Sequence, residues 1–405
     1  MSAVGPLTAG LQQRWDAALM PNYGTPPVAL KVGQGAEVWD VDGHRYIDLL
    51  GGIAVSALGH GHPELIKAVS RQVSQLAHTS NLYLHEPGIA LAERLLDLLG
   101  VAGSPSRVFL CNSGTEANEA ALKLVRRHAP ARTKIVAAEG SFHGRSLGSL
   151  SVTGKAAIRE PFAPFGWHTT FVPYGDADAL RTAVDSDTAA VFLEPTLGEG
   201  GVVPPPPGYL ADARQICDAT GAVFVLDEIQ SAIGRTGAWF AHQHEGVVPD
   251  VITLAKGLGG GLPIGACIGL GSYGGTFHRG DHGSTFGGNP VACAAALAVL
   301  NAIEDEGLLD HVVKVGGQLA DGIAAISHPL LAAVEGRGLW LALVLSSDLS
   351  PAVEEAAREA GFLVNAVQPG RIRLAPPLVL SSEQVQEFLD ALPRILDAAQ
   401  CSDRA

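Results

Sequence analysis

One lysine stands where a buried amine could do chemistry. Lys256 follows the apolar run of residues 251–255 and precedes Gly257, which is the position of a buried strand end. Burying an ammonium group is costly and lowers its pKa, and a desolvated amine is what Schiff-base chemistry needs. The alternative is a lysine whose side chain escapes to solvent at the rim of the sheet. Lys256 on its own leaves both interpretations open.

A carboxylate occupies the end of a second apolar run. Asp227 follows residues 222–226 directly. Such a carboxylate could pair with the nitrogen of a pyridinium ring and keep it protonated, which lets the ring withdraw electrons. An aspartate that only caps the following turn is the simpler interpretation of this residue alone.

A helix start is the third feature. Ser113 is a good N-cap, and Glu116 three residues later predicts a capping box. The amides of Gly114 and Thr115 would then lie at the positive end of the helix, where a phosphate can bind. Taken alone, a well-capped helix without a ligand is the simpler interpretation. A lysine, an aspartate and a possible phosphate-binding helix start at one edge of the sheet together favour the functional interpretation of all three.

An α/β sheet must position these residues. Short apolar runs alternate with amphipathic stretches, which predicts a mostly parallel sheet with helices on both faces. Ligands bind beyond the carboxyl ends of the strands in such sheets, so the three features would meet at one edge. The expected strands are 107–111, 134–138, 189–193, 222–226 and 251–255, and the expected helices include 114–128 and 208–220.

The pattern changes after a long Ala-rich helix that begins near Asn289. We expect a large domain over residues 61–305 and a smaller α+β domain over residues 306–405. The N-terminal segment, residues 1–60, is expected to pack with the small domain. The elements expected in the small domain are strands near 338–345 and 371–374 and helices near 351–360 and 381–399.

Composition narrows the possible functions. The 405 residues carry 41 acidic against 27 basic side chains, a formal net charge of -14, which argues against a nucleic-acid binder. No apolar run approaches the roughly 20 residues that span a bilayer, and residues 1–20 lack the pattern of a signal peptide. We therefore expect a cytoplasmic protein that is not bound to membranes.

Other candidate sites fail on inspection. The five cysteines form no CxxC pair, and the histidines at 60 and 62 or at 242 and 244 lack metal-ligand spacing, so no metal is expected. The loop 257–265 does not fit GxGxxG, and Gly154-Lys155 is followed by Ala156, which excludes a P-loop.

Several motifs resemble a known family. In chain order they are SGTEANE at 113–119, FHGR at 142–145, LDEIQ at 226–230, LAKG at 254–257 and GSTFGGNP at 283–290. Together they are highly specific, and the similarity to class III aminotransferases of pyridoxal phosphate (PLP) fold type I runs from about Asn22 to the C-terminal region. The segments NYGTPP at 22–27 and GIAV at 52–55 look most like the acetylornithine aminotransferases of the actinobacterial type.

The resemblance implies how this chain would hold the ring of pyridoxal 5′-phosphate. Lys256 would carry the cofactor as a Schiff base, and Asp227 would face the pyridine nitrogen. Gln230 would hydrogen-bond the ring hydroxyl, while Phe142 and Ile229 would pack on opposite faces of the ring.

The same resemblance implies a phosphate site shared between two subunits. Gly114 and Thr115 would bind the phosphate from one chain, and Thr285 would reach it from the partner subunit. Each active site would then be complete only in a homodimer.

The substrate residues follow from the same motifs. Arg145, assisted by Ser284, would hold the α-carboxylate of the amino donor, and Tyr23 would also contact the substrate. Arg373 resembles the arginine that receives a carboxylate of 2-oxoglutarate. Glu199 resembles the glutamate that neutralises this arginine when the donor is bound.

The resemblance implies transfer of the δ-amino group of N2-acetyl-L-ornithine to 2-oxoglutarate. The products would be N-acetyl-L-glutamate 5-semialdehyde and L-glutamate, in a step of arginine biosynthesis. Succinylornithine and 4-aminobutyrate remain open as donors, whereas Ile53 disfavours ornithine because a tyrosine is expected there in ornithine aminotransferases. A PLP aminomutase, which needs no external acceptor, and a catalytically silent binding protein are the alternatives from other classes.

Overall fold

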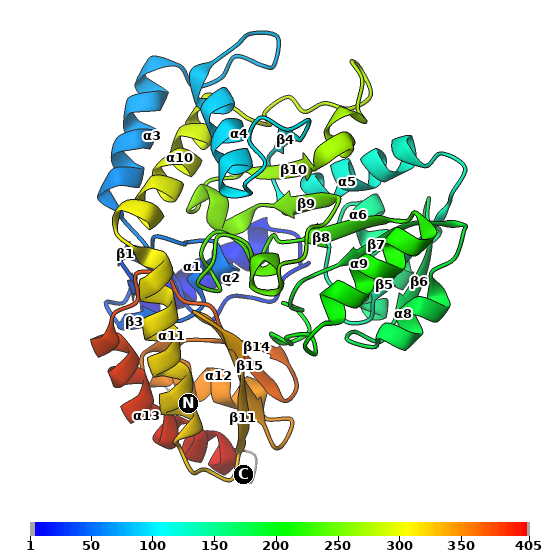
Figure 1. Ribbon diagram of the computed structural model, residues 1–405. Helices are drawn as coiled ribbons and strands as arrows, with labels where there is room; N and C mark the ends of the chain where they lie inside the picture. The colour runs from blue at the N-terminus through cyan, green and yellow to red at the C-terminus, as the bar shows by residue number, and fades with distance from the viewer. Residues whose placement is uncertain (1–4, 403–405) are drawn as a thin grey trace.

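The computed structural model describes residues 5–402, so the outermost ends of the expected terminal segments, residues 1–4 and 403–405, lie outside it. A seven-stranded sheet forms the centre of the molecule (Figure 1). Its strand order is β4 (Arg107–Cys111), β10 (Gly265–Gly269), β9 (Val251–Leu254), β8 (Val223–Asp227), β7 (Thr188–Leu193), β5 (Lys134–Ala138) and β6 (His168–Val172).

The sheet is mostly parallel, as predicted. Neighbours from β9 to β6 pair in parallel, and only β10 runs antiparallel to both of its neighbours, β9 and β4. Two antiparallel steps leave β4 parallel to β9, so the carboxyl ends of β4, β8 and β9 share one edge. The sequence prediction missed β6 and β10, and the predicted helix at 114–128 coincides with α5 (Gly114–His128).

Alternate side chains of the central strands pack into different cores. Val136 and Val191 contact the cluster formed with α8 (Ala177–Ala183) and α9 (Tyr209–Thr220), whereas Ile135 and Ala190 contact the cluster formed with α5. This period-2 alternation explains why the strands are apolar at every position. The other helices and turns of this region are α3 (Pro63–Gln75), α4 (Glu86–Leu98), α6 (Leu147–Ser151), α7 (Ala156–Arg159), α10 (Pro290–Asp305), η1 (Glu160–Phe162), η2 (Ala241–Glu245), η3 (Lys256–Gly259) and η4 (Gly271–Gly275).

Two four-stranded sheets lie outside the central one. One has the order β1 (Leu30–Gln34), β2 (Glu37–Asp40), β3 (Arg45–Asp48) and β13 (Phe362–Leu363), and β3 pairs with β13 in parallel. The other is antiparallel, in the order β11 (Leu331–Arg337), β12 (Trp340–Leu345), β15 (Arg371–Leu374) and β14 (Asn365–Gln368). The β3–β13 pairing ties the N-terminal segment to the C-terminal region, and the boundaries at 60 and 305 stay a prediction. The remaining helices are α1 (Pro6–Ala18), α2 (Gly51–Ala54), α11 (Leu308–Ala324), α12 (Ser350–Glu359) and α13 (Ser382–Ser402).

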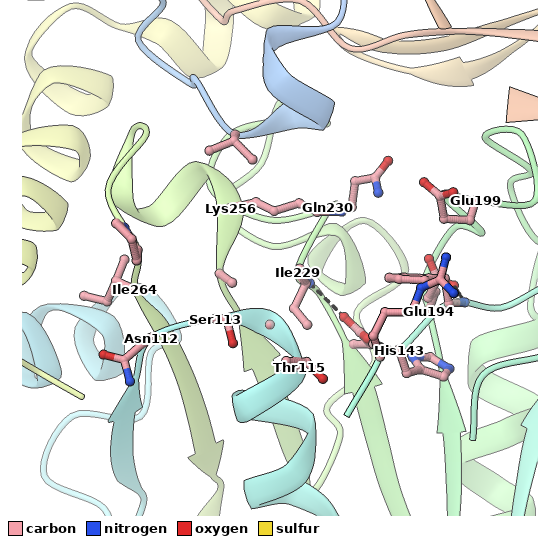
Figure 2. A pocket seen from close by; sticks show the side chains of 18 of the residues that line it. Asn112, Ser113, Thr115, His143, Glu194, Glu199, Ile229, Gln230, Lys256 and Ile264 are labelled. Atoms are coloured by element: carbon pink, nitrogen blue, oxygen red, sulfur yellow. Dashed lines mark hydrogen bonds and ion pairs between the residues drawn. The ribbon is translucent and has the colours of Figure 1, made fainter. Parts of the chain in front are cut away.

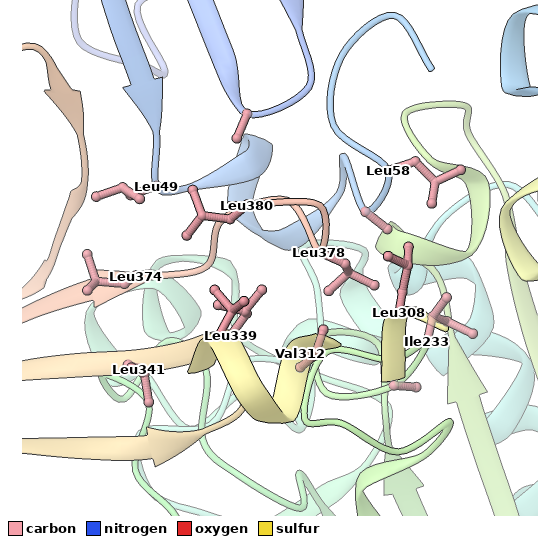
Figure 3. Close-up of a cluster of buried hydrophobic side chains, with 14 of the residues drawn as sticks. Leu49, Leu58, Ile233, Leu308, Val312, Leu339, Leu341, Leu374, Leu378 and Leu380 are labelled. Carbon is pink, nitrogen blue, oxygen red and sulfur yellow. The ribbon is translucent and has the colours of Figure 1, made fainter. Parts of the chain in front are cut away.

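A leucine-rich core joins these parts. Figure 3 shows Leu308 and Val312 of α11 in the same buried cluster as Leu339, Leu341 and, from the N-terminal segment, Leu49. Each of these side chains is buried, and burying a leucine or valine contributes about 1.5–3 kcal/mol. The core therefore fixes the C-terminal sheet, which carries Arg373, against β9, the strand that leads to Lys256. No helix within residues 5–402 is both long and apolar enough to cross a bilayer.

Candidate active site

A cavity of about 390 Å³ lies where β8 and β9 end, beside the first turn of α5 (Figure 2). Most of the residues predicted from the sequence meet on its wall. These are Gly114, Thr115, Phe142, Arg145, Glu199, Asp227, Ile229, Gln230 and Lys256.

Lys256 projects into this cavity from the turn after β9. Its backbone is left-handed, with φ of 45°, a strained conformation for a residue with a side chain. Burial lowers the pKa of the Lys256 amine to about 8, and the charge of Arg373 adds to this effect against the opposing charges of nearby carboxylates. At pH 7 about a tenth of the amine is therefore neutral and nucleophilic, far more than in an ordinary lysine.

Asp227 is a buried carboxylate with three hydrogen-bond donors. The amide of Asn118 and the Nδ1 atom of His143 each lie 2.8 Å from its Oδ2 atom, and the backbone N–H of Ile229 donates to Oδ1 at 3.0 Å. Such donors hold the carboxylate in one orientation. Neither Asn118 nor His143 was assigned a role from the sequence, although both lie inside the quoted motifs.

Only one of the two hydrogen bonds of the predicted capping box is present at the start of α5. The Ser113 hydroxyl accepts the N–H of Glu116 at 3.3 Å. The predicted capping box is wrong in its second half, because the Glu116 carboxylate accepts the backbone N–H of Asn112 at 2.9 Å rather than that of Ser113. The side-chain amide of Asn112 donates to the same carboxylate oxygen at 2.8 Å, which favours this position. The N–H groups of Gly114 and Thr115, in the first helical turn, have no acceptor within the helix.

Glu194 was missed by the sequence prediction. It follows β7 at the same sheet edge and accepts the backbone N–H groups of Phe142 and Gly198, each at 2.9 Å. Burial raises the pKa of Glu194 to about 7, an effect to which the charge of Asp227 adds and which His143 opposes. The strand-end rule that selected Asp227 applies equally to Glu194 and could have found it.

Arg373 forms a buried ion pair at the side of the cavity. Its guanidinium lies 2.6 Å from the Glu199 carboxylate and 3.1 Å from the Gln230 side-chain oxygen, and it also donates to Asn365 at 2.7 Å. The Arg373 side chain is 2% exposed and that of Glu199 is 23% exposed. A partly exposed carboxylate therefore covers a buried arginine, as the predicted substrate switch requires.

Arg145 lines the cavity as the second cation of the predicted substrate site. Its guanidinium carbon lies 5.8 Å from the centre of the Phe142 ring, within reach of a cation–π contact. Arg145 is exposed on the cavity wall, whereas Arg373 is buried and bonded to Glu199 and Gln230, which line the cavity.

Besides the covered Arg373, three predicted residues are not on the cavity wall of their own chain. Tyr23 is 74% exposed, and Thr285 is also exposed. Ser284 accepts hydrogen bonds from the Asn112 side chain at 3.0 Å and from the N–H of Gly287 at 2.9 Å. In a single chain, the cavity wall thus does not include Tyr23, Ser284 or Thr285, and their predicted roles stay predictions.

The groups that line the cavity fit pyridoxal phosphate. One cavity presents two helix N–H groups for a phosphate, a buried carboxylate for a ring nitrogen and an amine of lowered pKa for a carbonyl carbon. A Cβ atom on residue 114 would lie 2.8 Å from Ile229 Cδ1, so a glycine is needed to keep this wall clear. No cluster of His, Cys, Asp and Glu side chains suited to a metal ion occurs among residues 5–402.

Comparison with known proteins agrees with this geometry. The model of the family "Aminotransferase class-III" matches residues 19–396. The acetylornithine aminotransferase of Mycobacterium tuberculosis strain H37Rv is 58% identical over 98% of this chain and 99% of its own length, and that of Streptomyces coelicolor is 54% identical over 96% of each chain.

Solved structures show the same fold. N-acetylornithine aminotransferase from Stenotrophomonas maltophilia is 37% identical with a TM-score of 0.82, over 96% of this chain and 99% of its own. An ornithine aminotransferase from Toxoplasma gondii, described with PLP at its active site, is 32% identical with a TM-score of 0.93, over 98% of this chain and 96% of its own. The chain belongs to the class III aminotransferases, with pyridoxal 5′-phosphate as its cofactor.

Proposed function

We propose that this enzyme transfers the δ-amino group of N2-acetyl-L-ornithine to 2-oxoglutarate, as a step of arginine biosynthesis. The products are N-acetyl-L-glutamate 5-semialdehyde and L-glutamate. The observation that carries the proposal is the Glu199–Arg373 pair beside Lys256, because it lets one cavity accept both a donor without a second carboxylate and a dicarboxylate acceptor. The names of the relatives that are 54–58% identical supply the donor.

When bound, the cofactor supplies a carbonyl that accepts the amino group and a ring that withdraws electrons from the reacting carbon. Asp227 would hold a proton on the ring nitrogen, with His143 and Asn118 fixing its carboxylate. The Nζ atom of Lys256 would move a proton to and from the reacting carbon, a task suited to a pKa of about 8.

The two arginines would divide the recognition of carboxylates. Arg145 would hold the α-carboxylate of the donor through its planar fork. Arg373 stays neutralised by Glu199 at 2.6 Å while this donor is bound, and it receives a carboxylate of 2-oxoglutarate once Glu199 turns away.

The lining of the cavity favours an acylated donor. Val55, Leu262 and Ile264 are among the residues on its wall. Apolar surface accepts the uncharged acetyl amide of the donor more readily than the free α-ammonium of ornithine, whose desolvation is costly. Ile53, from which donor choice was inferred, is 39% exposed and does not line the cavity, while Val55 from the same segment does.

We also propose a homodimer in which Thr285 contributes to the partner's phosphate site. Supporting this, Phe286 is 61% exposed, and Leu82 and Leu84 are 85% and 90% exposed. Asn81 links the two segments by donating to the backbone oxygen of Gly287 at 3.2 Å. An apolar surface of this kind is typical of a subunit interface.

The cytoplasm is the proposed location of the enzyme. Four of the cysteines are buried and all five are free, which fits a reducing compartment.

Steady-state kinetics with purified enzyme test the function. Turnover of acetylornithine should depend on 2-oxoglutarate, which separates this enzyme from an aminomutase. A higher kcat/KM with ornithine, succinylornithine or 4-aminobutyrate than with acetylornithine would overturn the proposed donor.

A further inference from the structure

The Glu199 carboxylate has a second cationic partner that the proposed switch does not yet use. Its Oε1 atom lies 2.6 Å from Arg373, while its Oε2 atom lies 3.5 Å from the Nζ atom of Lys155. Burial alone would raise the pKa of Glu199, but the charge and hydrogen bond of Arg373, followed by the charge of Lys155, hold that pKa below its usual value. Both cations therefore act on this one carboxylate, and the more distant charge of Lys256 adds a smaller effect in the same direction.

The backbone beside Glu199 is fixed on both sides. The N–H of Gly198 donates to Glu194 at 2.9 Å, and the carbonyl of Glu199 accepts from the Gln368 side chain at 2.8 Å. Arg371 donates to the carbonyl of Gly201 at 2.9 Å. Glu199 can therefore release Arg373 by turning its side chain, whereas a shift of the whole loop would break these three bonds.

When the Glu199 carboxylate leaves Arg373, Lys155 is its remaining ion-pair partner in the part of the chain that the structure describes. The other hydrogen-bond partners of the Arg373 guanidinium are the neutral groups of Gln230, Asn365 and Gly198. An incoming carboxylate therefore takes the place of Glu199 and of no other anion. Within residues 5–402, Lys155 is then the one remaining cation that forms an ion pair with Glu199.

Lys155 is held where it can receive this carboxylate. It follows Gly154, whose N–H donates to Ser141 at 2.9 Å and whose carbonyl accepts from Gly140 at 3.3 Å. A Cβ atom on Gly154 would lie 2.1 Å from the carbonyl oxygen of Ala138, so the segment lies directly on the end of β5. The Lys155 side chain is 23% exposed, so it is not fully enclosed and can move together with the Glu199 carboxylate.

We propose that Lys155 is a specificity-determining residue that holds Glu199 after it leaves Arg373, and so favours a dicarboxylate acceptor. The inference rests on the proposed function, since it requires that Arg373 be uncovered in only one half of the reaction. Lys155 acts through Glu199 and is a positioning residue rather than a catalytic one. Without it, the released Glu199 would lose its remaining ion pair, and uncovering Arg373 would become less favourable.

Binding of glutarate, an unreactive dicarboxylate, tests this directly by calorimetry on the holoenzyme. Lys155→Met should raise the Kd of glutarate about three- to fivefold, the upper part of the range expected for a partly exposed ion pair. Lys155→Arg should restore most of the affinity because it keeps the charge. In a Glu199→Gln background, Lys155→Met should change the Kd by less than about twofold, since no carboxylate remains to be held.

Rapid kinetics supply the second measurement. Lys155→Met should lower kcat/KM for 2-oxoglutarate by the same factor through KM, and it should leave the half-reaction with acetylornithine within about twofold of wild type. Lys134→Met is the matched control, because Lys134 has a similar exposure of 17% and pairs with Asp185 at 2.7 Å away from the cavity. It should alter neither half-reaction.

Three results would overturn the inference. An unchanged Kd for glutarate in Lys155→Met would show that Glu199 needs no second partner. A loss that persists in the Glu199→Gln background would show that Lys155 touches the ligand itself. Equal losses in both half-reactions would indicate a general structural effect. Failure of the proposed function is distinguishable, because wild-type enzyme would then not react with acetylornithine while the glutarate comparison could still be made.

Discussion

The lysine that the enzyme needs for chemistry should weaken its fold. Burial lowers the pKa of Lys256 from 10.5 to about 8, and a shift of that size corresponds to about 3 kcal/mol of unfavourable free energy for the charged amine at pH 7. The unfolded chain binds the proton more tightly, so between pH 8 and 10.5 the stability of the folded protein rises with pH.

Replacing Lys256 by methionine should therefore stabilise the cofactor-free protein. Methionine keeps the unbranched stem and removes the charge, so we expect a gain approaching about 3 kcal/mol at pH 7. For a chain of 405 residues, this corresponds to a rise of about 3 °C in Tm. At pH 10 most of the native amine is already neutral, and the difference should fall below about 1 kcal/mol.

Thermal unfolding of the two cofactor-free proteins between pH 7 and pH 10 measures this effect. Lys67→Met is the control, because Lys67 is 73% exposed and its removal should leave Tm unchanged. A Lys256→Met protein that is less stable than wild type at pH 7, or a difference in Tm that does not shrink as pH rises, would refute the reasoning.

Three further substitutions test the cavity wall. Gly114→Ala should weaken cofactor retention at least about tenfold, measured by equilibrium dialysis, because its Cβ would lie 2.8 Å from Ile229 Cδ1; unchanged retention would place the cofactor elsewhere. Asp227→Asn should lower Tm, since the change sets an amide against the donor at His143 and a lost buried partner costs about 1–3 kcal/mol; it should also lower kcat, and wild-type values for both would contradict the role. Thr285→Ala should weaken cofactor retention while sedimentation still shows a dimer, and unchanged retention would remove Thr285 from the phosphate site.

The rule that ligands bind beyond the carboxyl ends of parallel strands accounts for the part of the site that could be predicted from the residues alone. Lys256 and Asp227 end adjacent parallel strands, and the rule that such ends share an edge predicts their meeting without knowledge of any contact. The motifs of the family added the Glu199–Arg373 pair, which no spacing could predict because the two residues come from different sheets and loops. The structure places them 2.6 Å apart.

Other features could not be predicted, for physical reasons. Strand β10 has a glycine at each end and follows a glycine-rich turn, so only three apolar residues in a row mark it in the sequence, and it pairs with both β4 and β9. The Asn118–Asp227 bond spans 109 positions along the chain and depends on how α5 lies over the sheet. At the start of α5 the N-cap Ser113 is as predicted, but the Glu116 carboxylate accepts from the N–H of Asn112, one residue earlier than predicted.

The central claim concerns the donor, and one competition experiment tests it most directly. Equal concentrations of acetylornithine, succinylornithine, ornithine and 4-aminobutyrate are mixed with the enzyme and 2-oxoglutarate, and mass spectrometry follows their disappearance. The ratios of the initial rates equal the ratios of kcat/KM. We predict that acetylornithine is consumed fastest, and that without 2-oxoglutarate consumption stops after at most one equivalent of donor per active site. Faster loss of any other donor would contradict the account.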